Sequence, residues 1–168
     1  MIKLLRLDDR MIHGQIATKW SRVLSVDRII VINDEAAGNE LVKRSLMMAA
    51  PATCKVAIRS VKDSIELLKN PKAKDHDILL IVANPVDLLT VAENVEGIQK
   101  VNIGNFGLLE KSDGIKRKRY NEYFWYSEEE ADIYRKIIEM GLECTIQVLP
   151  DDMPNPLSDI LKKGSLMK

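Results

Sequence analysis

The run DILLIVA at residues 77–83 constrains the fold most strongly, because it offers no polar face. A strand that is apolar at every position has to be covered on both faces, as a central strand of a parallel sheet is. The other short apolar, β-branched runs predict strands over 2–7, 28–32, 55–59, 98–103 and 145–149, with a short strand at 123–126.

Segments with helical spacing separate these runs. Apolar residues recur every three to four positions between Ile12 and Leu24, including Trp20 and Val23. Further helices are predicted over 39–50, after Ser60 and after Asn84-Pro85. Another is predicted to begin at Ser127, which forms a capping-box pattern with Glu130, and to end at a C-cap at Gly141. Residues 157–163 are either a terminal helix or a frayed tail.

Alternating strands and helices predict the fold class: an α/β fold with an open, mostly parallel, doubly wound sheet and helices on both faces. Residues 1–168 are expected to form a single domain, in which residues 104–121 are irregular. Ligands of such sheets bind at the carboxyl ends of the strands, where the strand order reverses. The loop after the first strand is therefore the first candidate site.

The composition excludes some classes of function. Lys and Arg number 25 and Asp and Glu also 25, so the chain lacks the basic excess that nonspecific nucleic-acid binding needs. The basic run 116–119 is interpreted as a solvated strand or loop, or else as a docking segment for an acidic protein. Cys54 and Cys144 are interpreted as small buried hydrophobes, and no metal site is expected. No apolar stretch approaches membrane-spanning length, so direct membrane insertion is not expected, and the chain is predicted to be cytosolic.

The segment DDRMIHGQ at residues 8–15 follows the first predicted strand and carries the densest polar chemistry. His13 is a nucleophile that can form a covalent phosphoryl adduct near neutral pH. Arg10 could donate two hydrogen bonds to phosphoryl oxygens, and Gly14 lets the backbone approach a phosphate. Gln15 adds an amide donor at the start of a helix, where backbone N–H groups favour anions.

The neighbouring carboxylates leave alternatives open. Either Asp8 or Asp9 could fix the tautomer of the imidazole or hold Arg10 in place. A carboxylate pair after a first strand can instead bind Mg²⁺, as in receiver domains, but the phosphorylatable Asp that this reading requires after a later strand is absent, because the fourth strand ends at Asn84. His13 could also be a plain histidine at a helix start.

The glycine segment 102–107 and His76 are two further features of the sequence. The glycine segment 102–107 follows the fifth predicted strand and lacks the Lys-Ser/Thr of a Walker loop. It is interpreted as a possible partner or anion loop through Gly104, Asn105 and Phe106, although Phe106 could equally be a packed aromatic. His76 precedes the fourth strand, at the end of the sheet away from the crevice, and is interpreted as a surface residue.

The sequence resembles a known family at these residues. The segment 8–15, with Trp20 after it, resembles the DDRLIHGQ…W signature of IIB components of the bacterial sugar phosphotransferase system, mannose/fructose/sorbose class. Met11 stands in place of the more usual Leu. The resemblance extends over nearly the whole chain, through residues 31–37, 48–51, 102–107 and 147–150.

This resemblance implies a phosphocarrier transferase with an α/β fold. It implies that His13 carries the phosphoryl group on Nδ1, beside Arg10. The donor would be the phosphohistidine of a separate IIA protein, and the acceptor a sugar held by the membrane components IIC and IID, which would recruit the chain to the inner face of the membrane. Neither a nucleotide nor another cofactor would be needed. The sequence leaves open the sugar and the oligomeric state.

Overall fold

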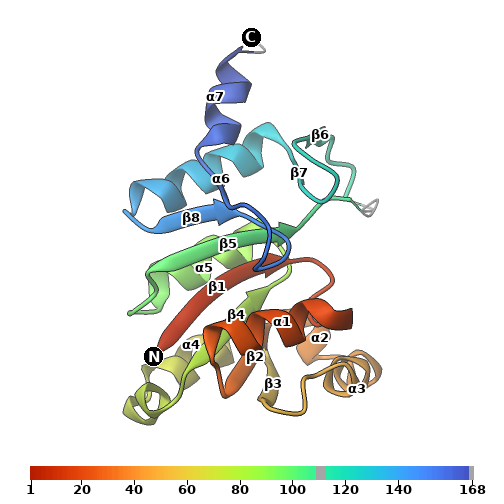
Figure 1. Cartoon of the computed structure of the whole chain (residues 1–168), viewed down its shortest axis with the longest axis vertical. Coiled ribbons are helices and arrows are strands. Elements are labelled where there is room, and N and C mark those ends of the chain that lie inside the picture. The colour runs from red at the N-terminus through yellow and green to blue at the C-terminus, as the bar shows by residue number, and fades with distance from the viewer. Residues whose placement is uncertain (109–112, 167–168) are drawn as a thin grey trace.

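The computed structural model describes residues 1–108 and 113–166, and its centre is a seven-stranded sheet (Figure 1). The strands run in the order β3-β2-β4-β1-β5-β8-β9, parallel from β3 to β8, with β9 antiparallel to β8. Their bounds are β1 Ile2–Asp8, β2 Arg28–Ile32, β3 Lys55–Arg59, β4 Ile78–Val82, β5 Lys100–Asn105, β8 Glu143–Ile146 and β9 Asn155–Pro156. A separate antiparallel pair consists of β6 (Lys118–Arg119) and β7 (Trp125–Tyr126).

Helices cover both faces of the sheet, which confirms the predicted fold class. One face packs against α1 (Gly14–Leu24), α2 (Asp34–Ala37) and α3 (Glu40–Met48), through buried side chains such as Trp20 and Leu46. The other face packs against α4 (Val61–Lys69), α5 (Pro85–Asn94), α6 (Glu128–Glu139) and α7 (Asp159–Leu166). A 3₁₀ helix, η1 (Pro71–Asp75), follows α4. Strand β4 is buried at all of its positions, as the run 77–83 predicts.

The strand order reverses between β1 and β5, and the carboxyl ends of these two strands are termed the crevice. From β1 the chain crosses through α1 toward β2, whereas from β5 it crosses through α6 toward β8, on the other side of the sheet. The two connections diverge from neighbouring strands over opposite faces, and a crevice opens between such strands at their carboxyl ends. The segment 8–15 leaves β1 at this point.

The helix ends follow the local sequence signals. Asn84 accepts a hydrogen bond from the backbone of Asp87, with Pro85 at the first helical position of α5. At α6 the capping box between Ser127 and Glu130 is complete. Gly141 lies just beyond α6 with a φ of +80°, the left-handed conformation that a helix-terminating glycine supplies.

The strand and helix boundaries depart from expectation in several places. Strand β5 continues through Gly104 and Asn105, within the region predicted to be irregular, because Asn105 pairs with Asp8 of β1 after a one-residue shift of register that skips Gly104. Backbone pairing with a neighbouring strand outweighs the low strand preference of Gly and Asn. Strand β8 ends at Ile146, earlier than predicted, and α2 and η1 were not predicted. Positions 109–112 of the predicted irregular region lie outside the described residues.

Three interpretations of side chains also change. Val23 is 62% exposed and does not belong to the buried stripe of α1. Arg117, in the basic run, is nearly buried and pairs with Glu130 at 2.7 Å and Asp113 at 2.8 Å, so the run is not simply solvated. Cys144 is only half-buried, and its partial burial still raises the pKa of the thiol to about 11.

Cys54 is half-buried as well, and its Sγ lies 3.3 Å from the carbonyl oxygen of Val26. Within residues 1–108 and 113–166, no helix has the length and apolar character needed to cross a bilayer.

Candidate functional site

The loop after β1 reverses direction and brings His13 back to the carboxyl end of β1. The backbone N–H of Met11 donates to the carbonyl of Asp8 at 2.9 Å, and that of Arg10 donates to Asp8 Oδ1 at 3.0 Å. Met11 and Gly14 have φ angles of 61° and 48°. Two left-handed residues so close together make the chain reverse before α1 begins, and the one at Met11 costs strain that a glycine would avoid.

His13 and Asp8 form the centre of the site. The Nε2 atom of His13 lies 3.1 Å from Asp8 Oδ2, and the histidine side chain is 21% exposed whereas Asp8 is fully buried. Because an ionised carboxylate only accepts hydrogen bonds, the neutral form of the imidazole carries its proton on Nε2 and has its lone pair on Nδ1. Among the described residues Nδ1 has no hydrogen-bond partner, and His13 makes no side-chain capping bond to α1. Its imidazole is thus not used as a plain helix cap.

Asp8 is stabilised as a carboxylate from three sides. Burial on its own would raise the pKa of Asp8, but the hydrogen bonds of His13 and Asn105 and the charge of Arg6 outweigh it and lower the pKa. Arg6 Nη2 lies 3.2 Å and Asn105 Nδ2 3.1 Å from Asp8 Oδ2. The carboxylate therefore keeps its negative charge, and its hydrogen bond to His13, at neutral pH.

Arg6 is the residue of the site that the sequence did not predict. It is a single charge within an apolar strand, and such a residue alone indicates only the strand. Its side chain is 2% exposed and donates to the side chain of Asn102 and to the backbone carbonyls of Gln147 and Val148. The guanidinium also stacks on Trp20 at 5.2 Å from the ring centroid. The available signal was its spacing: Arg6 and Asp8 are two residues apart and share one face of a strand.

Gly104 provides the space that Arg6 occupies. A Cβ atom at this position would lie 2.0 Å from Arg6 Nη2 and 2.3 Å from Cζ, well inside van der Waals contact. A Gly104→Ala variant should displace the guanidinium and lose about 1–3 kcal/mol of stability, the usual range for overpacking. Urea denaturation measures this loss. A stability equal to that of the wild type would show that Arg6 is not confined by this glycine.

Asp9 acts on the opposite wall of the crevice. Its carboxylate accepts a hydrogen bond from the backbone N–H of Gly107 at 3.1 Å, and its own N–H donates to the carbonyl of Asn105 at 2.9 Å. Asp8 therefore contacts His13, whereas Asp9 ties the β1 loop to the chain after β5. The described residues contain no cluster of three or more His, Cys, Asp or Glu suited to a metal.

The predicted partner or anion loop is corrected. Gly104 and Asn105 form the end of β5. The guanidinium of Arg6 lies against Gly104, and the side chain of Asn105 donates a hydrogen bond to Asp8. Phe106 is 1% exposed and lies under the guanidinium of Arg117, 5.1 Å from its ring centroid, so it is a packed aromatic without an accessible face. These three residues are buried beneath the loop of His13 and do not form a surface loop.

Arg10, Gly14 and Gln15 remain at the surface around His13. Within the described residues, the guanidinium of Arg10 has no hydrogen bond or ion pair, which leaves it free to bind an anion. No acidic side chain lies in the first turn of α1, so the partial positive charge of its N-terminus is not neutralised there. Arg10 and the N-terminus of α1 therefore place positive charge beside the imidazole.

His76 lies at the opposite end of the sheet, as predicted, where its Nδ1 is 2.8 Å from Asp27 Oδ2. It contributes nothing to the crevice.

Comparison with known proteins gives a consistent result. Residues 2–168 match the family model of the PTS system sorbose subfamily IIB component. A probable phosphotransferase enzyme IIB component of Streptococcus pyogenes is 36% identical, over 96% of this chain and 99% of that protein. The mannose-specific EIIAB component of Escherichia coli is 29% identical, over 97% of this chain but only 49% of that protein. The crystal structure of the IIBSor domain of the Klebsiella pneumoniae sorbose permease superposes with a TM-score of 0.87 at 28% identity, covering 96% of each chain.

Fold, site and similarity together define the class: a phosphotransferase-system protein of the IIB type. The chain belongs to the sorbose subfamily of PTS IIB components, within the sorbose/mannose class.

Proposed function

We propose that residues 1–168 form one IIB unit that carries a phosphoryl group on Nδ1 of His13, taken from a phosphohistidine and passed to a sugar. The observation that carries this proposal is the hydrogen bond between His13 Nε2 and the buried Asp8. It fixes the proton on Nε2 and directs the lone pair of Nδ1 away from the protein interior. Membership in a phosphotransferase family supports the same chemistry.

The transfer step follows from this tautomer. The Nδ1 lone pair of His13 forms a bond to phosphorus while the P–N bond of the donor phosphohistidine breaks, and its electron pair remains on the donor imidazole. Positive charge develops on the ring of His13, and the Asp8 carboxylate, already ionised, stabilises it through Nε2–H. In the onward step the P–N bond on His13 breaks and its electron pair returns to Nδ1, while a hydroxyl oxygen of the sugar bonds to phosphorus and the hydroxyl proton passes to a base beside the bound sugar or to water.

The surface of the site suits a migrating phosphoryl group. Its transition state spreads negative charge over three equatorial oxygens, so positioning and electrostatic stabilisation provide most of the catalysis. Arg10 can donate two parallel hydrogen bonds to these oxygens, and the first N–H groups of α1, from Gly14 and Gln15, can donate from the other side. No residue of the site requires a nucleotide or a metal for this role.

The partners follow from the family. The proposed donor is the phosphohistidine of a IIA protein, and the proposed acceptor is a sugar bound by IIC and IID at the inner face of the membrane. The proposed location of this chain is the bacterial cytoplasm. Relatives are named for mannose, sorbose and fructose, so these names do not select one sugar.

The chemical stability of the label tests the proposal. We expect the wild-type chain, incubated with a ³²P-charged IIA protein, to gain one phosphoryl group that is lost in acid and kept in base. Fragmentation mass spectrometry should place it on His13. A label that is stable in acid and depends on Mg²⁺ would instead indicate an aspartyl phosphate, and the carrier assignment would be wrong.

A further inference from the structure

Strand β3 forms an open edge of the sheet. The N–H of Lys55 donates to the carbonyl of Asp27, and the carbonyl of Arg59 accepts from the N–H of Asn33, so these two residues face β2. Because backbone groups alternate in direction along a strand, the N–H and C=O groups of Val56 and Ile58 point away from the sheet. No strand in the described part of the chain lies beyond β3. The edge can therefore accept the backbone of another strand.

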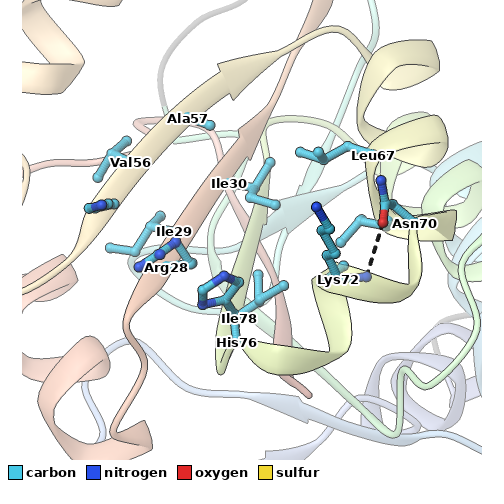
Figure 2. A pocket seen from close by; sticks show the side chains of 13 residues that line it. Arg28, Ile29, Ile30, Val56, Ala57, Leu67, Asn70, Lys72, His76 and Ile78 are labelled. Carbon is cyan, nitrogen blue, oxygen red and sulfur yellow. Dashed lines mark hydrogen bonds between the residues drawn. The ribbon is translucent and has the colours of Figure 1, made fainter.

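A cavity lies beside this edge on each face of the sheet. One has a volume of about 390 Å³ and lies between β2, β3, α4 and η1, with Ala57 and Leu67 among its walls (Figure 2). The other has a volume of about 660 Å³ and lies between β3 and α3, with Met47 and Met48 among its walls. Both cavities reach β3 itself, since each is partly lined by Val56 and Ala57.

A strand added to β3 would enter the space between these cavities. Its side chains would point alternately to the two faces of the sheet, and hence alternately into the two cavities. The walls nearest the middle of β3 are apolar, with Ile30 and Leu68 on one face and Ile58 and Met47 on the other. The middle of an added strand should therefore be apolar on both faces.

Positive charge surrounds the apolar centre. Lys55 and Arg59 lie at the two ends of β3, while Lys72 and Arg44 lie on the walls of the two cavities. Within the described residues none of these four side chains has an ion-pair partner. The second cavity also contains one carboxylate, Glu40, which pairs with Lys43 at 3.5 Å. Figure 2 shows Lys72 and Arg28 on opposite sides of the first cavity. The complementary segment is acidic at its ends.

The same charges disfavour a second copy of this chain as the occupant. Two β3 strands paired antiparallel about Ala57 would place Lys55 of one copy directly opposite Arg59 of the other. Like charges in that position destabilise a pair of strands, and basic residues at strand edges are a known defence against edge-to-edge association.

We propose that the β3 edge is a docking site for an extended segment of a partner protein, with an apolar centre flanked by acidic residues. The edge is separated from β1 by β2 and β4, so the docked segment leaves the His13 crevice open. The proposal is independent of the phosphoryl chemistry and assigns a second surface to this fold.

Fluorescence anisotropy with a labelled synthetic peptide of sequence Glu-Asp-Val-Leu-Val-Asp-Glu tests the proposal. We expect binding with a Kd on the order of 10 μM, as is common for short added strands. Methylating the backbone nitrogens of the three central peptide residues should weaken binding at least tenfold, because the added strand loses its donors. Replacing the four acids with lysine should abolish it.

Charge reversal on the protein completes the test. The Lys55→Glu/Arg59→Glu variant should bind the peptide at least tenfold more weakly, whereas Lys136→Glu, an exposed reversal on α6, should bind it as the wild type does. Absence of binding at millimolar peptide, or equal binding of the N-methylated peptide, would overturn the proposal. A dimer in sedimentation equilibrium would also overturn the proposal, if the peptide could not displace it and the Lys55→Glu/Arg59→Glu substitutions dissociated it. The occupant of the β3 edge would then be a second copy of this chain.

Discussion

A His13→Ala variant is expected to take up no phosphoryl group from a phosphorylated IIA protein, while it folds as the wild type does. Within the part of the chain that the structure describes, only Nδ1 of His13 combines a lone pair, partial exposure and a position beside Arg10 and the N-terminus of α1. Intact-mass spectrometry after incubation with the charged donor measures uptake, and circular dichroism checks the fold. The other histidine provides the matched control: His76→Ala should be phosphorylated at the wild-type rate, because His76 pairs with Asp27 at the far end of the sheet.

An intermediate variant separates the nucleophile from its support. Asp8→Asn keeps the size of the side chain but presents an amide beside Nε2 and removes the charge that stabilises the phosphorylated ring. We expect uptake to slow by about 10- to 100-fold, by analogy with the loss seen when a group that orients a metal-binding histidine is removed. Full uptake by His13→Ala, or undiminished uptake by Asp8→Asn, would show that the acceptor and its support have been assigned incorrectly.

The sequence predicted the sheet, its helices and the crevice because these depend on patterns that are local in the chain. The apolar run 77–83 requires a doubly covered strand, and the caps at Asn84 and Ser127 determine where helices begin. The position of His13 followed in the same way, since a parallel sheet places the loop after its first strand at the carboxyl end.

What could not be predicted depends on contacts between distant segments. Arg6 reads as one charge in an apolar strand until β5 and the chain after β8 supply its partners, Asn102 and the carbonyls of Gln147 and Val148. Likewise, Gly104 reads as a flexible loop residue until Arg6 occupies the space beside it. The sequence could not decide whether Asp8 or Asp9 faces His13 for the same reason. Asp8 contacts His13 and Arg6, whereas Asp9 contacts the backbone of Gly107, which is distant in sequence.

The second large effect concerns Arg6 and stability. An Arg6→Met variant keeps much of the apolar stem but leaves the fully buried carboxylate of Asp8 without its cation. Removing one partner of a buried ion pair costs about 3–5 kcal/mol, and here the remaining hydrogen bonds from His13, Asn105 and the backbone of Arg10 compensate the desolvated charge of Asp8 only in part. For a chain of this size the same loss lowers Tm by about 10 °C. Urea denaturation at neutral pH measures the free energy, and a loss below about 1 kcal/mol would contradict the assigned role.

The pH dependence of this loss has a defined sign. In the wild type the pKa of Asp8 is lowered, so its contribution to stability is present above the pKa of an unfolded aspartate and is lost as pH falls through the folded value. In Arg6→Met the pKa of Asp8 is higher than in the wild type, because the charge of Arg6 no longer opposes the effect of burial. Protonation of Asp8 at low pH then removes the cost of burying its charge. The stability difference between the two proteins should therefore be largest near pH 7 and shrink toward about pH 3.

A double variant separates charge from packing at this site. In Arg6→Met/Asp8→Asn no buried carboxylate remains to be compensated, so most of the stability lost in Arg6→Met should return, although His13 stays without its support. Phosphoryl uptake should remain as slow as in Asp8→Asn. If the double variant were as unstable as Arg6→Met, the guanidinium would act mainly through Trp20, Asn102 and the carbonyls of the chain after β8. The cycle thus decides whether this buried arginine is present for Asp8, and through it for His13, or for the packing of the sheet.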